Sequence, residues 1–199
     1  MPLLGACSQA GLVLLNGSVK SDYPQSITKD IAYGKEPWQR LDVYPNAALE
    51  QAPVIIFFYG GGWGSGKKSQ YKFAAEAFVE LGYTVVVPDY VKYPQGKFPS
   101  FVKDGAEAFS WTKQNIAKHY GDSNNIYIVG HSAGAHIGGL LTSDNRYLAE
   151  FGYSKTDIRG FAGLAGPYGF TPEEAKYRRI FEPESNFEIM KAMNHIDGS

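Results

Sequence analysis

The stretch Ile126-Tyr127-Ile128-Val129-Gly130-His131-Ser132-Ala133-Gly134 decides the fold of this chain. Residues 126–129 form an uninterrupted apolar run, which is typical of a strand buried on both faces of a parallel sheet. Beyond residue 134, apolar side chains recur at helical spacing through residue 141 and predict a helix. The stretch therefore predicts a strand, a sharp turn at Ser132 and a helix, which is the setting in which the pattern G-x-S-x-G carries a nucleophilic serine.

Ser132 is the candidate nucleophile of this turn. A serine at such a junction takes a strained backbone conformation, and glycines are needed at 130 and 134 because a side chain there would collide with the neighbouring strand and helix. The hydroxyl would lie at the carboxyl edge of the sheet, beside a helix N-terminus whose N–H groups favour negative charge. The alternative is an ordinary strand-to-helix turn in which Ser132 is the helix N-cap.

A second glycine cluster, Tyr59-Gly60-Gly61-Gly62-Trp63-Gly64, follows the most apolar strand of the chain. Consecutive glycines let backbone N–H groups line a concavity without side chains in the way, as an oxyanion hole requires. The alternative is a phosphate-binding loop, because Gly61 to Lys67 has the spacing G-x-x-x-x-G-K. Lys68 then stands where that loop needs a hydroxyl for Mg²⁺, and Trp63 would crowd a phosphate, so the oxyanion hole is the better interpretation.

Outward from these clusters the chain alternates strands with helices. Two short strands, Ile27–Tyr33 and Leu41–Tyr44, are predicted to pair antiparallel at an edge of the sheet. Central parallel strands buried on both faces are predicted at Pro53–Tyr59, Thr84–Val87, Ile126–Val129 and Gly160–Leu164. The pattern predicts an α/β fold with a doubly wound, mostly parallel sheet and short lid-type helices over 170–195.

Two helices are predicted between the strands. Ser69 would cap the first, whose apolar face includes Phe73, Ala77 and Leu81 and which Gly82 would end. The second begins at Ser100 and would bury the side chains of Phe101, Gly105, Ala108, Phe109, Thr112 and Ile116.

The composition indicates one globular domain over 27–199. The 199 residues are 44% hydrophobic and 15% aromatic, whereas a disordered chain would have fewer aromatics and more net charge. A formal net charge of −1 offers no basic surface for a nucleic acid or an anionic membrane. No uninterrupted apolar run reaches the length of a membrane span.

Residues 1–26 are predicted to be a separate N-terminal arm. Leu4-Gly5-Ala6-Cys7 resembles the end of a bacterial lipoprotein signal, in which the cysteine becomes the lipid-bearing first residue. The basic segment and most of the apolar segment of such a signal are missing. A lipid anchor at Cys7 would place the protein in the cell envelope or outside the cell, whereas a lone cysteine in a mobile arm would fit the cytoplasm. The oligomeric state is not predicted.

Three motifs in this order resemble the α/β-hydrolase superfamily: Phe57-Phe58-Tyr59-Gly60-Gly61-Gly62-Trp63, Val87-Pro88-Asp89-Tyr90 and Gly130-His131-Ser132-Ala133-Gly134-Ala135-His136. They are similar to bacterial carboxylesterases related to hormone-sensitive lipase and to the feruloyl-esterase-like (BD-FAE) group, from about Ile27 to the end of the chain.

The resemblance implies a serine ester hydrolase that acts on small or short-acyl esters through an acyl-enzyme. Ser132 would be its nucleophile, and the N–H groups of Gly61, Gly62 and Ala133 would hold the oxyanion. No metal or organic cofactor is implied. Tyr59 stands where many members carry histidine before the glycines, which predicts a changed loop shape with the hole retained.

The sequence presents no complete catalytic triad. In this fold the acid and the base follow the serine, usually after the seventh and eighth strands, and neither strand is visible here. His131 and His136 would point with the helix and not back at the hydroxyl, and His119 precedes the serine. This leaves His195 as the only candidate base in the right order, although the residues around it resemble the approach to a further strand. We therefore expect a piece of a longer enzyme that lacks the last strands. An amidase or formamidase with the same machinery, or a catalytically incomplete fragment or binding domain, are the alternatives.

Overall fold

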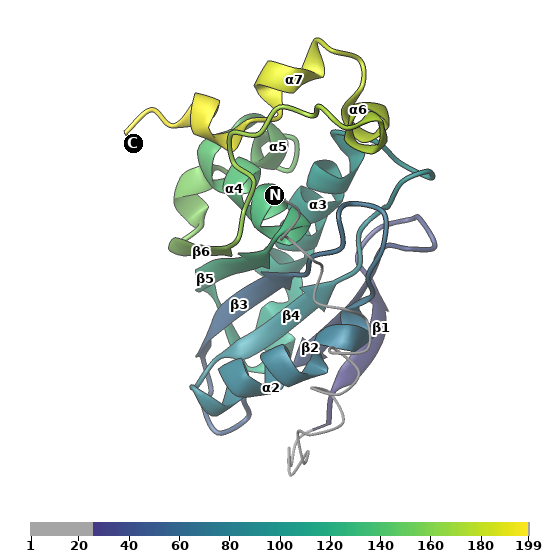
Figure 1. Cartoon of the computed structure of the whole chain (residues 1–199). Helices are drawn as coiled ribbons and strands as arrows, with labels where there is room; N and C mark the ends of the chain where they lie inside the picture. The colour runs from purple at the N-terminus through teal and green to yellow at the C-terminus, as the bar shows by residue number, and fades with distance from the viewer. Residues whose placement is uncertain (1–25, 199) are drawn as a thin grey trace.

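The computed structural model describes residues 26–198, so the proposed lipid-bearing Cys7 lies outside the described residues. One mixed sheet of six strands forms the centre, in the order β1-β2-β4-β3-β5-β6 (Figure 1). Its strands are β1 (Thr28–Ala32), β2 (Arg40–Tyr44), β3 (Ala52–Phe58), β4 (Thr84–Pro88), β5 (Gly121–His131) and β6 (Gly160–Leu164).

The pairing of the strands confirms the predicted topology. β1 and β2 form the antiparallel pair at one edge, and β2 also pairs antiparallel with β4. The β4–β3, β3–β5 and β5–β6 pairs are all parallel. Parallel neighbours need crossover connections, which the intervening helices supply. The chain therefore has the doubly wound α/β architecture that its alternation of apolar runs indicates.

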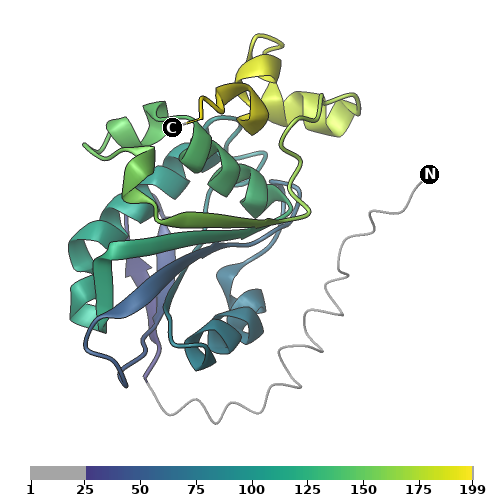
Figure 2. The same cartoon turned by 90° about the vertical axis from the view of Figure 1, so that its left-hand side faces the viewer.

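Helices cover both faces of this sheet (Figure 2). α2 (Lys72–Glu80) packs on β4 and β2 from one side, and α3 (Ser100–Asn115) and α4 (Ala133–Ser143) pack on β5 from the other. The remaining helices are short: η1 (Lys68–Tyr71), η2 (Ile116–His119), α5 (Arg146–Ala149), η3 (Lys155–Asp157), α6 (Ala175–Phe181), α7 (Asn186–Ile189) and η4 (Ala192–His195). None of the helices among residues 26–198 is long and apolar enough to cross a membrane.

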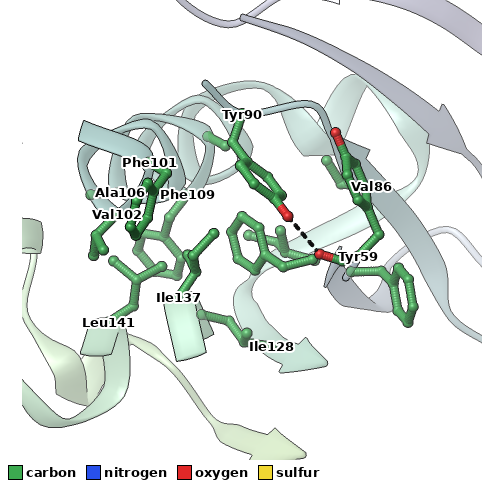
Figure 3. Close-up of a cluster of buried hydrophobic side chains, with 14 of the residues drawn as sticks. Tyr59, Val86, Tyr90, Phe101, Val102, Ala106, Phe109, Ile128, Ile137 and Leu141 are labelled. Atoms are coloured by element: carbon green, nitrogen blue, oxygen red, sulfur yellow. Dashed lines mark hydrogen bonds between the residues drawn. The ribbon is translucent and has the colours of Figure 1, made fainter. Parts of the chain in front are cut away.

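The main core lies between the sheet and the α3–α4 pair. Phe101 and Phe109 of α3 meet Ile137 of α4 above Ile128 of β5, and all four side chains are fully buried (Figure 3). Every residue that the sequence predicted on the buried face of α3 is buried in the structure. Helix α3 therefore follows its hydrophobic periodicity closely.

Two predictions about the sheet and α2 are wrong. β6 is not a central strand buried on both faces: it pairs only with β5 among the described strands, and Leu164 is 56% exposed. Ser69 does not cap α2, because it lies within the 3₁₀ turn η1, and the helix begins at Lys72. The helix ends at Glu80, so Leu81 lies beyond its last residue and is 72% exposed, whereas Val79 is buried.

The lid-type helices predicted over 170–195 are confirmed as short helices. α6, α7 and η4 follow one another beyond the carboxyl edge of the sheet, next to α4 (Figures 1 and 2). Ile180, Phe181 and Met190 from this segment are buried against the rest of the molecule. We refer to residues 170–195 below as the lid.

The burial of Val79 and the exposure of Leu81 give a test of how α2 packs on the sheet. Val79→Ala removes buried methyl groups and is expected to lower the free energy of unfolding by about 1–3 kcal/mol. Leu81→Ala removes a larger side chain from an exposed position and should change it by less than about 0.5 kcal/mol. Chemical denaturation of both variants measures this. A larger loss of unfolding free energy in Leu81→Ala than in Val79→Ala would instead support the buried face that the sequence predicted, which includes Leu81.

Candidate active site

Ser132 occupies the sharp turn between β5 and α4. Its backbone dihedrals are φ 51° and ψ −116°, a combination that non-glycine residues rarely adopt. Its N–H donates to the Leu164 carbonyl of β6 at 2.8 Å, and its own carbonyl accepts from the His136 N–H at 3.0 Å. Strained backbone of this kind persists only where the surroundings impose it, and here both neighbouring elements do so.

The two glycines of this turn are required by close backbone contacts. A Cβ atom on Gly134 would lie 2.0 Å from the carbonyl oxygen of Phe58, at the end of β3. One on Gly130 would lie 2.5 Å from the carbonyl oxygen of Gly134 itself. Both distances are far below any van der Waals contact, so the steric argument for G-x-S-x-G holds at both positions in the structure.

The glycine cluster lies directly beside Ser132. β3 and β5 are parallel neighbours with Phe58 paired to Gly130, so the loops that follow them emerge at the same edge of the sheet. A Cβ atom on Gly60 would lie 3.1 Å from Cβ of Ser132. The structure thus brings together the two clusters that the sequence singled out.

The glycine loop, residues 60–67, folds into a tight turn with unusual backbone angles. Gly61 has φ +147° and Gly62 φ +57°, and Trp63 follows with φ 55°. The N–H groups of Gly64 and Ser65 both donate to the Gly61 carbonyl, at 3.2 and 3.1 Å. The carbonyl of Gly61 is therefore a hydrogen-bond acceptor within the loop.

The N–H groups expected to hold an oxyanion are not used by the backbone. Within residues 26–198, no backbone carbonyl accepts a hydrogen bond from the N–H of Gly61, Gly62 or Ala133. Ala133 begins α4, where the first N–H groups of a helix have no partner in the helix itself. Donors of this kind beside a serine hydroxyl can stabilise negative charge that develops on a bound carbonyl oxygen.

The side chain of Trp63 packs the glycine loop against the lid. Its side chain is 3% exposed, stacks on Phe170 at 5.6 Å between ring centroids and meets the ring of Phe181 edge-on at 4.8 Å. The sequence does not reveal this contact, because the aromatics of the lid lie more than a hundred residues downstream. The local sequence signal is Trp63 itself, because a large aromatic side chain in a glycine-rich loop needs an apolar surface to pack against.

His136 is a structural histidine. It is completely buried in α4, and its Nε2 lies 2.8 Å from the carbonyl oxygen of Met190 in the lid. Burial lowers the pKa of His136 to about 4, although the bond to Met190 opposes this effect. The ring is therefore neutral at physiological pH, and it donates to the lid instead of facing the Ser132 hydroxyl.

The structure places His195, the weak candidate for the base, at the wrong end of α4. Its Nε2 lies 2.8 Å from the Ile189 carbonyl oxygen and 3.7 Å from Asp144, the residue that follows α4. Ser132 precedes the same helix, whose 11 residues rise about 16 Å at about 1.5 Å each. His195 therefore does not reach Ser132 in this arrangement, and no residue in the described part of the chain forms a hydrogen bond with the Ser132 hydroxyl.

A polar cluster beside the glycine loop was not predicted. Both the Tyr59 hydroxyl and the Lys68 backbone N–H donate to the carboxylate of Asp89. Asp89 belongs to the motif Val87-Pro88-Asp89-Tyr90, so the sequence signal was present, but a linear motif does not show which loop the carboxylate contacts.

Comparison with known proteins places this site in a family. Residues 41–178 match the family described as BD-FAE. A probable isoprenylcysteine alpha-carbonyl methylesterase of Oryza sativa subsp. japonica is 30% identical over 93% of this chain and 48% of its own length. A kynurenine formamidase of Danio rerio is 28% identical over 82% of this chain and 54% of its own length. The chain spans about half the length of these curated relatives.

A solved structure supports the same assignment at the level of the fold. Esterase B from Lactobacillus rhamnosis superposes with a TM-score of 0.74 over 96% of this chain and 69% of its own, at 17% identity. The match over residues 41–178 includes both glycine clusters. The chain therefore belongs to the BD-FAE family of α/β-hydrolase esterases.

Proposed function

We propose that this chain carries the nucleophile and the oxyanion hole of a serine carboxylic-ester hydrolase. The observation that carries the proposal is the contact between Gly60 and Ser132, which sets a strained serine and unpaired loop N–H groups side by side at one edge of the sheet. Family membership supports an ester as the substrate, since the related plant protein is named a methylesterase.

The proposed reaction begins with attack of the Ser132 hydroxyl oxygen on the ester carbonyl. The carbonyl oxygen becomes an oxyanion, which the N–H groups of Gly61, Gly62 and Ala133 stabilise. The oxyanion then collapses, expels the alcohol and leaves an acyl-enzyme, which water hydrolyses. The residues that take and return the proton are not assigned, because His136 and His195 are hydrogen-bonded to backbone carbonyls of the lid.

An aromatic cluster borders the glycine loop on the side of the lid. Trp63, together with Phe170 and Tyr177 of the lid, forms an aromatic cluster next to the glycine loop. Of the other aromatics in the motif region, Tyr90 and Phe98 are buried in the core, so they do not contribute surface for a substrate. Trp63 itself is only 3% exposed, so we infer a small or short-acyl ester from the family resemblance and not from this cluster.

The nucleophile assignment predicts the site of covalent labelling. A fluorophosphonate probe is expected to modify Ser132 alone, because among the serines of residues 26–198 only this one combines a strained turn with neighbouring oxyanion donors. Mass spectrometry of the labelled peptide identifies the residue, and Ser132→Ala should abolish the label. Ser143→Ala is the matched control, since that hydroxyl lies at the other end of α4 and donates to the Gly139 carbonyl. Label on any other serine would refute the assignment.

The oxyanion hole predicts the effect of a substitution in the glycine loop. In Gly61→Ala the added methyl would lie 2.1 Å from the Ser65 carbonyl oxygen, so the turn must open and move its N–H groups. Loss of an oxyanion donor reduces the rate about 10²- to 10³-fold, and the rate constant for phosphonylation of Ser132 should fall by that order.

Gly82→Ala controls for backbone strain in this experiment. Gly82 has φ +97° and open space around its Cβ position, so it shares the strain without the collision and lies outside the loop. Its variant should lose stability and keep the phosphonylation rate. A Gly61→Ala protein that reacts as fast as the unmodified chain would show that these N–H groups do not serve the reaction.

The alternative of an amidase or formamidase has support from the formamidase relative. An amine leaving group must be protonated as it departs, whereas p-nitrophenolate leaves without help. His136 and His195 both donate to carbonyl groups of the lid, so neither is placed to supply that proton to a group on Ser132. We expect this chain to release p-nitrophenol from p-nitrophenyl acetate in preference to p-nitroaniline from p-nitroacetanilide. Comparable rates on the two substrates would favour the amidase.

A further inference from the structure

We propose that Asp89 is the positioning residue of the oxyanion hole: one carboxylate oxygen holds both ends of the glycine loop. This inference rests on the proposed function, since it assigns a task to a residue outside the reacting groups. Asp89 touches neither Ser132 nor the three N–H donors, so it acts through the shape of the loop.

Both anchors of the loop meet at the same atom. Tyr59 immediately precedes Gly60, and its hydroxyl donates to Oδ1 of Asp89. Lys68 immediately follows Lys67, and its backbone N–H donates to the same Oδ1 at 2.9 Å. The two residues that flank the loop 60–67 are therefore hydrogen-bonded to the same oxygen atom.

The backbone of Asp89 is fixed to the sheet. The Asp89 N–H donates to the Arg40 carbonyl at 2.8 Å, and its own carbonyl accepts from the Tyr33 hydroxyl at 2.5 Å. Nζ of Lys92 lies 3.8 Å from Oδ1 and provides a nearby positive charge. Asp89 follows β4 directly, so the anchor of the loop is tied to the ends of β2 and β4.

Tyr59 is well suited to its part of this arrangement. Its ring stacks between those of Tyr71 and Tyr90, at 5.3 and 4.9 Å between centroids. The Tyr90 hydroxyl donates to the Tyr59 carbonyl at 2.8 Å (Figure 3). Burial, with Tyr90 and Asp89 nearby, raises the pKa of the Tyr59 hydroxyl well above its usual value. The phenol therefore stays protonated and remains a donor to the carboxylate.

The far end of the loop is held by charge as well. Nζ of Lys68 donates to Asp30 at 2.6 Å and to Asp42 at 2.7 Å, which fixes this lysine against β1 and β2. The loop between the anchors contains five glycines, which have little conformational preference of their own. The bonds to Asp89 at both ends of the loop therefore help to fix the direction of its N–H groups, in addition to the bonds within the loop to the Gly61 carbonyl. A shift of about 1 Å in a catalytic group can slow a reaction about 10²-fold.

The test compares four variants of the full chain by two measurements. Asp89→Ala removes the shared acceptor, whereas Asp89→Asn retains an oxygen that can accept both bonds. Tyr59→Phe removes one anchor and keeps the ring stacks. Asp104→Ala is the matched control, because Asp104 is another buried carboxylate that accepts from Trp38, Gln39 and the Val91 N–H, none of them in the loop.

The first measurement is amide hydrogen exchange over residues 60–67, which does not depend on any activity. We expect faster exchange in Asp89→Ala and Tyr59→Phe, and exchange close to that of the unmodified chain in Asp89→Asn and Asp104→Ala. Unchanged exchange in both Asp89→Ala and Tyr59→Phe would overturn the proposal. If Asp89→Ala does not fold, Tyr59→Phe decides the question with the stacked core intact.

The second measurement is the rate of Ser132 phosphonylation by the fluorophosphonate probe. Asp89→Ala should react about 10²-fold more slowly, while Asp89→Asn and Asp104→Ala should react at nearly the original rate. Slow reaction of Asp104→Ala together with Asp89→Ala would show a general loss of stability and would overturn the positioning role. If the unmodified chain is not labelled at Ser132, the proposed function fails, and hydrogen exchange alone then decides whether Asp89 positions the loop.

Discussion

The approach of α4 to the end of β3 constrains the rest of this structure. The position of a Gly134 Cβ atom lies 2.0 Å from the Phe58 carbonyl oxygen, so backbone meets backbone with no room for a side chain. That contact draws the first turn of the helix against the strand that precedes the glycine loop. It also forces the strained φ and ψ of Ser132, because the chain must pass from β5 into α4 within one residue.

The same contact explains why the lid lies where it does. Once α4 is fixed against β3, Trp63 in the following loop and His136 in the helix come within 5.2 Å of each other, with their rings perpendicular. Phe170 and Phe181 pack on both rings, and Met190 accepts the His136 hydrogen bond. One aromatic cluster therefore joins the glycine loop, the helix after the serine and the lid. Displacing the lid would expose this apolar cluster to water, which opposes opening.

The sequence predicted correctly the features that depend on neighbouring residues in the chain. It failed for features that depend on contacts with distant parts of the chain. Gly130 and Gly134 could be assigned because any side chain at a strand-to-helix turn collides, and the face of α3 because its burial follows a regular period. The face of α2 was misplaced because this short helix carries apolar residues on more than one side, and the spacing selected Leu81, beyond its end, and not the buried Val79. β6 was expected to be central because its composition is apolar, yet composition does not reveal how many neighbours a strand has. His195 followed the serine in sequence, but the lid carries it to the far end of α4.

Trp63 shows how the strained loop and the aromatic cluster depend on each other. A tryptophan at φ 55° is unfavourable on its own, and nothing within the loop compensates for it. Its ring, however, is buried among lid aromatics, and burial of a large apolar side chain offsets backbone strain. The packing thus holds the residue after Gly62 in a conformation that the free chain would avoid. It also keeps water away from one side of the loop, and in a drier setting each unpaired N–H group interacts more strongly with a developing negative charge. In the proposed enzyme, the same tryptophan would therefore strengthen the electrostatic effect of an oxyanion hole whose loop Asp89 holds at both ends.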